Sequence, residues 1–123
     1  MKHLILQDHN LSYLVYFRPK DKAKMYETIY KAQQQYWSQS YGNFELLNYI
    51  TLKLNRNGFK VADISQEIKE MVDVRCGFSP TSFVYGKTRI FENSYGFWFK
   101  LDNATHTCKT IDEAIAIIDK GGK

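Results

Sequence analysis

With 123 residues, the chain is long enough for one domain to bury a hydrophobic core without disulfides or metals. Hydrophobic residues make up 44% of it and aromatic residues 15%, which excludes intrinsic disorder, and the net charge of +4 permits a nucleic acid or an acidic protein as a partner without requiring one. No apolar stretch approaches the roughly 20 residues of a membrane-spanning helix, so we expect no membrane partner.

The amino-terminal third of the chain predicts a β-hairpin followed by a helix. Residues 3–7 and 11–17 are rich in apolar side chains and flank the turn-forming triplet Asp8-His9-Asn10. Over residues 22–37 the apolar side chains recur with the period of an α-helix; they are Met25, Ile29, Ala32 and Tyr36. We therefore expect two antiparallel strands and then one amphipathic helix.

Two further helices are expected in the middle of the chain. The first has Asn43 as its cap and ends near Gly58, and its apolar face comprises Phe44, Leu47, Ile50 and Leu54. Asp63 is followed three residues later by Gln66, which is the spacing of a capping box and predicts the start of the next helix. The apolar side chains of that helix are Ile64, Ile68, Met71 and Val72.

After Gly77 the pattern becomes that of strands. Segments 83–91 and 95–101 are joined by a short turn, and a second turn leads to a third strand at 105–109. Thr110 and Glu113 form another capping box, which opens a final helix over 111–120.

These elements define an α+β fold class: an amino-terminal β-hairpin, three helices, a three-stranded antiparallel meander and a carboxy-terminal helix. The chain has no internal repeat, linker or low-complexity stretch. We therefore expect a single domain over residues 1–123, with 1–75 and 78–123 as its sub-units.

The two longer strands carry many rings, and alternation decides which of them are buried. Alternate residues of a strand share a face. Phe97, Phe99 and Leu101 form an apolar set that must face the core, most naturally together with Val84 and Ile90. The opposite face then interleaves flat rings with cations; its residues are Tyr85, Lys87, Arg89, Trp98 and Lys100. Such a face suits nucleic acid, because cations meet phosphates and rings stack on bases. The alternative is that the first three helices cover this face.

A second cluster of cations lies at the start of the first helix and consists of Arg18, Lys20, Lys22 and Lys24. The positive end of the helix dipole disfavours each of them by about 0.3 kcal/mol or more. The cluster is either a solvated face or a secondary basic patch that docks an anionic partner.

Motifs for catalysis or metal binding are weak. His106 and Cys108 would share a face of a strand, as a nucleophile and its base require, but no third residue is placed to orient the histidine. Together with Cys76 they supply only three ligands for a zinc site, at unhelpful spacing. We therefore expect no enzyme, no cofactor and no metal, and an enzyme that uses Cys108 and His106 is the third interpretation. The apolar run at residues 4–6 is too short for a signal peptide, so we expect a cytoplasmic protein with reduced thiols.

Residues 81–120 resemble a known DNA-binding fold. The residues that carry the resemblance are Tyr85, Lys87, Trp98, the run Thr110-Ile111-Asp112-Glu113-Ala114, and Asp119. With three short antiparallel strands and a helix capped in this way, the segment resembles the fold shared by ethylene-response-type transcription factors of plants and the arm-binding domains of tyrosine integrases. The resemblance implies a sheet that enters the major groove, with contacts from Tyr85, Lys87, Arg89, Trp98 and Lys100.

The expected function is therefore non-enzymatic binding of nucleic acid, with DNA favoured over RNA, through the face that carries the rings and cations. The small size and the composition suit an accessory protein of a phage or mobile element. The main alternative is an inhibitor or adaptor that binds an acidic surface on a nucleic-acid enzyme, because exposed aromatic residues are also enriched at protein interfaces.

Overall fold

The computed structural model of the chain describes residues 1–39, 45–67 and 70–121. Eight strands occur in the described part: β1 (Lys2–Asp8), β2 (Leu11–Phe17), β3 (Lys60–Asp63), β4 (Val74–Arg75), β5 (Ser82–Tyr85), β6 (Thr88–Asn93), β7 (Gly96–Leu101) and β8 (Ala104–Cys108). The helices described are a 3-10 turn, η1 (Pro19–Asp21), and three α-helices, α1 (Lys22–Ser38), α2 (Leu46–Arg56) and α3 (Ile111–Asp119). The α+β class is confirmed.

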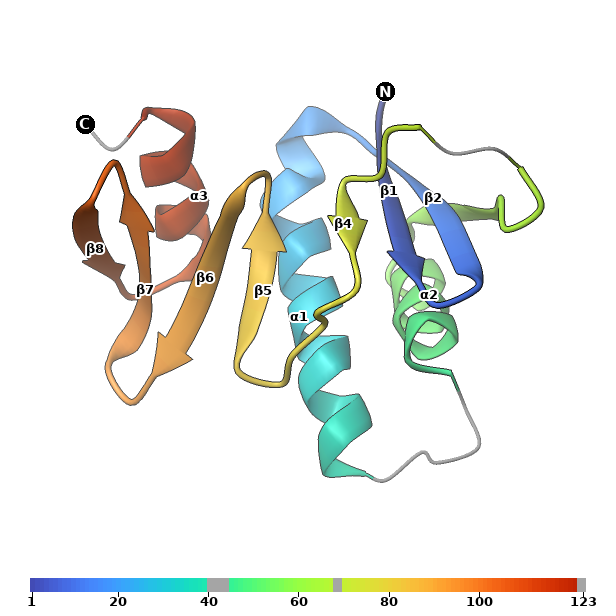
Figure 1. Cartoon of the computed structure of the whole chain (residues 1–123), viewed down its shortest axis with the longest axis horizontal. Helices are drawn as coiled ribbons and strands as arrows, with labels where there is room; N and C mark the ends of the chain where they lie inside the picture. Colours follow the sequence, from blue (N-terminus) through green and yellow to red (C-terminus); the bar gives the residue numbers. More distant parts are fainter. Residues whose placement is uncertain (40–44, 68–69, 122–123) are drawn as a thin grey trace.

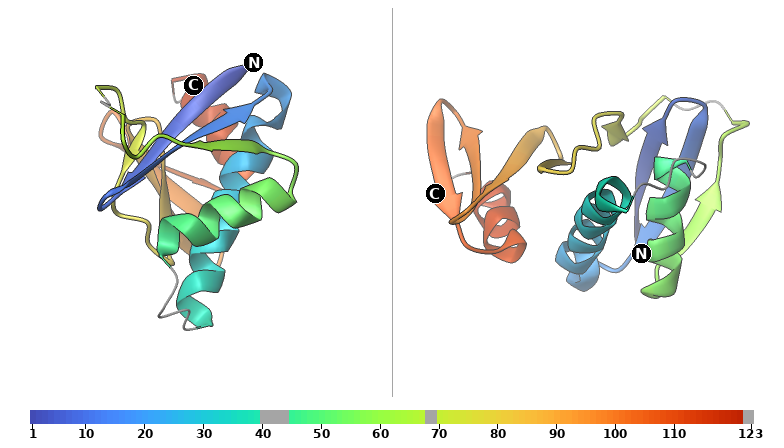
Figure 2. Two further views of the ribbon diagram at one scale, coloured as in Figure 1. Left: turned by 90° about the vertical axis from the view of Figure 1, so that its right-hand side faces the viewer. Right: turned by 90° about the horizontal axis from the view of Figure 1, so that it is seen from below.

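The strands form two four-stranded sheets. Sheet A has the strand order β3-β2-β1-β4, and sheet B has the order β5-β6-β7-β8. The long helix α1 lies in the middle of the molecule (Figure 1). Seen from below, α3, α1 and α2 form a row, with sheet B at the α3 end and sheet A at the α2 end (Figure 2). Each sheet therefore has one face toward the helices.

Sheet A is built on the predicted hairpin, which is confirmed. β1 and β2 pair along their whole length, and His9 in the turn between them has a φ of 52°. The side chains of these strands that enter the core are Leu4, Leu6, Val15 and Phe17. β3 pairs antiparallel with β2, and β4 pairs parallel with β1. The buried side chains of both sheets belong to one continuous hydrophobic cluster.

α1 and α2 bury the apolar faces expected of them. On α1 these residues include Met25, Ile29 and Ala32, and on α2 they are Leu47, Ile50 and Leu54. The predicted cap Asn43 and the predicted core residue Phe44 lie outside the described residues, and α2 begins at Leu46.

The prediction that a helix begins after Asp63 was wrong. Residues 60–63 form strand β3, and Asp63 is the last residue that pairs with β2. The Oδ1 atom of Asp63 accepts hydrogen bonds from the backbone N and the hydroxyl of Ser65, at 2.9 and 2.6 Å, and so stabilises a turn instead of a helix start. Met71, expected inside, is 82% exposed, and Ile68 is outside the described residues.

Sheet B is a meander of four strands where three were expected. Gly86 and Lys87 form a turn that divides the predicted strand 83–91 into β5 and β6. α3 follows β8 as predicted, with Thr110 as its cap: Thr110 Oγ1 accepts from Glu113 N at 3.1 Å, and Glu113 Oε2 accepts from Lys109 N at 3.2 Å. None of the helices in the part of the chain that the structure describes is long and apolar enough to span a membrane.

Candidate nucleic-acid interface

The hydrogen-bond register of sheet B assigns its side chains to two faces. The inner face packs on α1 and α3, and its buried residues are Phe83, Tyr85, Ile90 and Phe99. The outer face points away from α3, and no described helix or strand lies over it (Figure 2). The outer face consists of Ser82, Val84, Arg89, Phe91, Trp98, Lys100, Thr105 and Thr107.

The prediction that Tyr85 shares an exposed face with Arg89 was wrong. Gly86 has a φ of 61°, a conformation that favours glycine, and it opens a two-residue turn that reverses the chain. Because of this reversal, residues before and after the turn do not alternate as they would in one strand. Tyr85 therefore lies on the inner face, with 8% of its surface exposed. Lys87 is exposed in the turn itself, at the rim of the outer face.

A stacked aromatic pair lies on the outer face. Phe91 of β6 is directly opposite Trp98 of β7, and their ring centroids are 4.5 Å apart with an interplanar angle of 15°. Both side chains are half-buried. Phe91 was not among the predicted contact residues, although its alternation with Arg89 was a signal that would have included it.

Two cations lie next to this pair on the same face. Lys100 is exposed, whereas Arg89 is half-buried. The Nη1 atom of Arg89 donates to the carbonyl of Gly77 at 3.1 Å and to the hydroxyl of Ser82 at 2.9 Å. Through these two hydrogen bonds Arg89 stabilises the loop before β5. The structure brings Arg89, Trp98 and Lys100 together as predicted and adds Phe91 to them.

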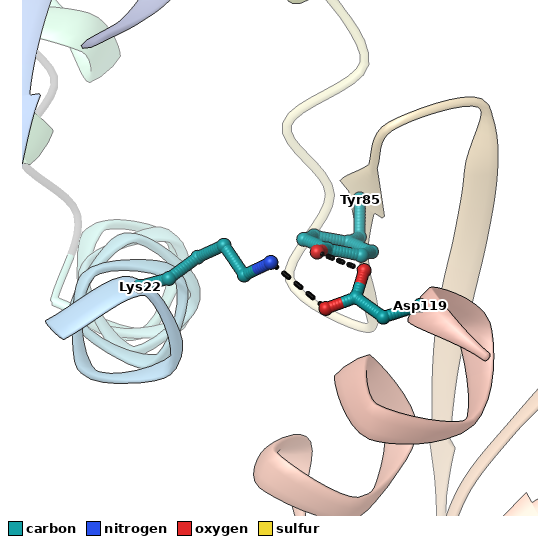
Figure 3. Close-up of polar contacts among 3 residues, drawn as sticks. All are labelled: Lys22, Tyr85 and Asp119. Carbon is teal, nitrogen blue, oxygen red and sulfur yellow. Dashed lines mark hydrogen bonds and ion pairs between the residues drawn. The ribbon is translucent and has the colours of Figure 1, made fainter. Parts of the chain in front are cut away.

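Tyr85 instead belongs to a polar cluster that joins α1, β5 and α3 (Figure 3). Asp119 Oδ2 accepts from Lys22 Nζ at 2.8 Å, and Asp119 Oδ1 accepts from the Tyr85 hydroxyl at 2.6 Å. Burial alone would raise the pKa of Asp119, but the hydrogen bonds from Lys22 and Tyr85 outweigh it and lower that pKa. Burial would lower the pKa of Lys22, and the contacts with Asp119 and Tyr85 raise it instead. The pKa of Tyr85 is raised, first by burial and then by Asp119.

The secondary basic patch is partly neutralised by internal partners. Lys22 pairs with Asp119, and Arg18 Nε lies 3.1 Å from Asp21 Oδ2. Lys24 Nζ lies 5.9 Å from the ring centroid of Phe59. Because two of its cations face carboxylates, this patch offers less free charge to an anionic partner than the sequence suggested.

His106 and Cys108 share the inner face of β8 but have separate contacts. The imidazole stacks on Phe99, with centroids 5.5 Å apart, and the Cys108 thiol donates to the carbonyl of Thr110 at 3.4 Å. Burial, and then the Glu113 carboxylate, raise the pKa of Cys108, which disfavours the nucleophilic thiolate. Within residues 1–39, 45–67 and 70–121, no group of three or more His, Cys, Asp or Glu side chains is placed to hold a metal ion.

The chain matches no protein-family model, no curated protein and no solved structure. What the outer face of sheet B binds is therefore inferred from its own side chains.

Proposed function

We propose that this protein binds nucleic acid through the outer face of sheet B. The observation that carries the proposal is the stacked pair of Phe91 and Trp98 on a face that also holds Arg89 and Lys100. Aromatic rings offer stacking surfaces to bases of any sequence, and cations beside them contact the phosphates. An aromatic group left half-exposed on an uncovered sheet face is typical of an interaction site.

The order of the elements also supports this proposal. β6, β7 and β8 are antiparallel neighbours, and the capped helix α3 follows them on the opposite side of the sheet. The DNA-binding fold that residues 81–120 resemble has the same order of three strands and a helix. β5 is an additional strand at the edge nearest α1.

The outer face is a better candidate than the basic patch at the start of α1. Arg18 and Lys22 of that patch face aspartates, and such pairing neutralises the charge that a phosphate would meet. Lys87 and Lys100 are exposed. The outer face also holds the half-buried rings of Phe91 and Trp98, which have no counterpart among the residues of the patch.

An inhibitor or adaptor that binds a protein through the same rings is the second candidate, and salt distinguishes the two. Phosphate contacts release counterions, so the logarithm of nucleic-acid affinity falls linearly with the logarithm of salt concentration. An interface between aromatic groups and a protein depends on salt only weakly.

The double variant Lys87→Ala/Lys100→Ala tests the proposal directly. We expect weaker binding to nucleic acid and a salt slope that is shallower by up to about two units, one for each phosphate that a lysine no longer neutralises. Both side chains are exposed, so the free energy of unfolding should change by no more than about 0.5 kcal/mol. Fluorescence anisotropy over a salt series measures the slope, and urea unfolding measures the stability.

A matched control is Arg56→Ala/Lys120→Ala, which removes the same net charge from exposed positions at the ends of α2 and α3. The control should keep the slope of the parent protein. Equal slopes for the two double variants would mean that the outer face does not contact phosphate, and the proposal would fail.

A further inference from the structure

A cavity of about 500 Å³ opens at the β5 edge of sheet B. Residues from five separate segments line it, among them Trp37 at the end of α1, Phe78 before β5, Arg89 of β6, and the carboxylates Asp8 and Glu45. Its volume falls in the range of about 300–1,000 Å³ that small-molecule sites occupy. The cavity is therefore large enough for a group such as a nucleobase.

Trp37 offers an aromatic surface at this cavity. It is 52% exposed, an unusual degree of exposure for so large an apolar side chain. Its Nε1 atom donates to the carbonyl of Phe78 at 3.3 Å, and its ring meets Tyr36 edge-on, at 5.4 Å and 87°. These contacts hold the indole in one orientation, so it can stack on a ligand without first being ordered.

The cavity is continuous with the outer face of sheet B. Arg89 lies on that face and also lines the cavity, where it holds Gly77. Gln33, which is 1% exposed, fixes the same wall by donating to the carbonyls of Ser79 and Ser82, at 2.6 and 3.0 Å. A ligand that crosses the sheet from Trp98 toward β5 reaches this preformed wall.

The carboxylates of the cavity favour a base over a phosphate. Asp8 and Glu45 would repel an anion, but their carboxylates accept hydrogen bonds from the N–H groups of a base. In a duplex the Watson–Crick N–H groups are paired and both faces of each base are stacked, so a base cannot enter the cavity or stack on Trp37. Arg89 is engaged by Gly77 and Ser82, so Lys100 and, at the rim, Lys87 are the exposed cations of the outer face. Duplex binding depends mainly on many phosphate contacts, and two lysines supply few of them.

We infer that the ligand of the outer face is single-stranded nucleic acid, and that one unpaired base enters this cavity and stacks on Trp37. The inference depends on the proposed function and adds two things to it: the strandedness of the ligand and a second binding site. Trp98 and Trp37 would then contact different bases of the same strand.

The two tryptophans of the chain allow each site to be observed separately. Trp98→Phe leaves Trp37 as the only indole, and Trp37→Phe leaves Trp98 as the only indole. Both proteins are titrated with one mixed-sequence oligonucleotide of about 12 nucleotides, as a single strand and as a duplex. We expect the single strand to quench both emissions over the same concentration range and to bind at least about tenfold more tightly than the duplex.

Truncation of the ring gives a second readout. Trp37→Ala should weaken single-strand binding by about 5- to 150-fold, the range for the loss of one stacked base. Leu52→Ala, which trims another exposed apolar side chain, on α2, is the control and should bind as the parent protein does. Circular dichroism and thermal melts confirm that each variant is folded.

The outcomes separate the two proposals. If the single strand quenches Trp98 and leaves the emission of Trp37 unchanged, the base-binding cavity is wrong and the proposed function stands. If the duplex binds as tightly as the single strand, the inference about strandedness is wrong. If neither form of the oligonucleotide quenches either protein, both this inference and the proposed function are wrong.

Discussion

Asp119 accepts hydrogen bonds from two elements outside its own helix, namely α1 through Lys22 and β5 through Tyr85 (Figure 3). The three residues are far apart in the sequence, and no local pattern links them. The sequence therefore predicts surface positions for Tyr85 and Lys22, where they would bind a partner. It correctly predicts that Trp98 and Lys100 share a face, because alternation within one strand needs no knowledge of distant contacts. Arg89 joins them because β6 pairs with β7 with Phe91 opposite Trp98.

Asp119→Asn should destabilise the protein by about 0.2–1 kcal/mol at pH 7, because it removes the charge that pairs with the partly exposed Lys22. The pKa of Asp119 is lowered in the folded protein, so its contribution is complete above the ordinary pKa of 3.8 and is lost as the pH falls through the lowered value. The pKa of Lys22 is raised, so on the alkaline side the contribution persists up to 10.5 and is lost as the pH rises further.

Urea unfolding of the parent protein and the variant across a pH series checks this prediction. The exposed Glu67→Gln is the control for the loss of one negative charge. A difference between Asp119→Asn and the parent that stays constant well below pH 3.8 would contradict the role given to the carboxylate.

At the scale of elements, two similar capping sequences had different outcomes. Thr110 and Glu113 do open a helix, since the apolar residues that follow, including Ile111, Ala114 and Ile115, are buried. Asp63 instead ends a strand that pairs with β2, and its carboxylate bonds to Ser65 within a turn. In an N-cap and in such a turn a nearby backbone N–H donates the same hydrogen bond to an acidic or hydroxyl side chain, so spacing alone does not distinguish them.

The turn at Gly86 and Lys87 changes the predicted site more than the strand at Asp63 does. Because these two residues reverse the chain, Tyr85 lies on the inner face instead of the predicted outer face, and Lys87 lies in the turn at the rim. The aromatic and β-branched residues on both sides of the turn favour strands so strongly that the turn was missed. A glycine inside a strand pattern is the local signal for such an interruption.

Thr110→Ala should destabilise the protein by about 0.5–2 kcal/mol, because Glu113 N loses the hydroxyl that accepts its hydrogen bond. Replacing the same residue with serine keeps the hydroxyl and should restore most of the stability. Chemical denaturation of the three proteins measures this difference. Equal stability of the alanine and serine variants would show that the cap contributes nothing to α3.

At the scale of the whole molecule, α1 is the element that both halves share. It packs on α2 beside sheet A and on α3 beside sheet B (Figure 1). The buried side chains form one cluster. The α+β class and the hairpin were predictable from periodicity. The parallel pairing of β1 with β4 was not, because it joins Leu6 to Val74 and leaves no trace in local sequence.

The central claim is that the outer face of sheet B binds nucleic acid, and an NMR titration tests it most directly. The ¹⁵N-labelled protein is titrated with a short single-stranded oligonucleotide, and the amide and indole signals are followed. Binding should shift the indole signal of Trp98 and the amides of Arg89, Phe91 and Lys100, while the amides of Ile50 and Leu54, buried on α2, stay in place. Shifts confined to residues 18–24, with the Trp98 indole unmoved, would contradict the claim and assign binding to the basic patch before α1.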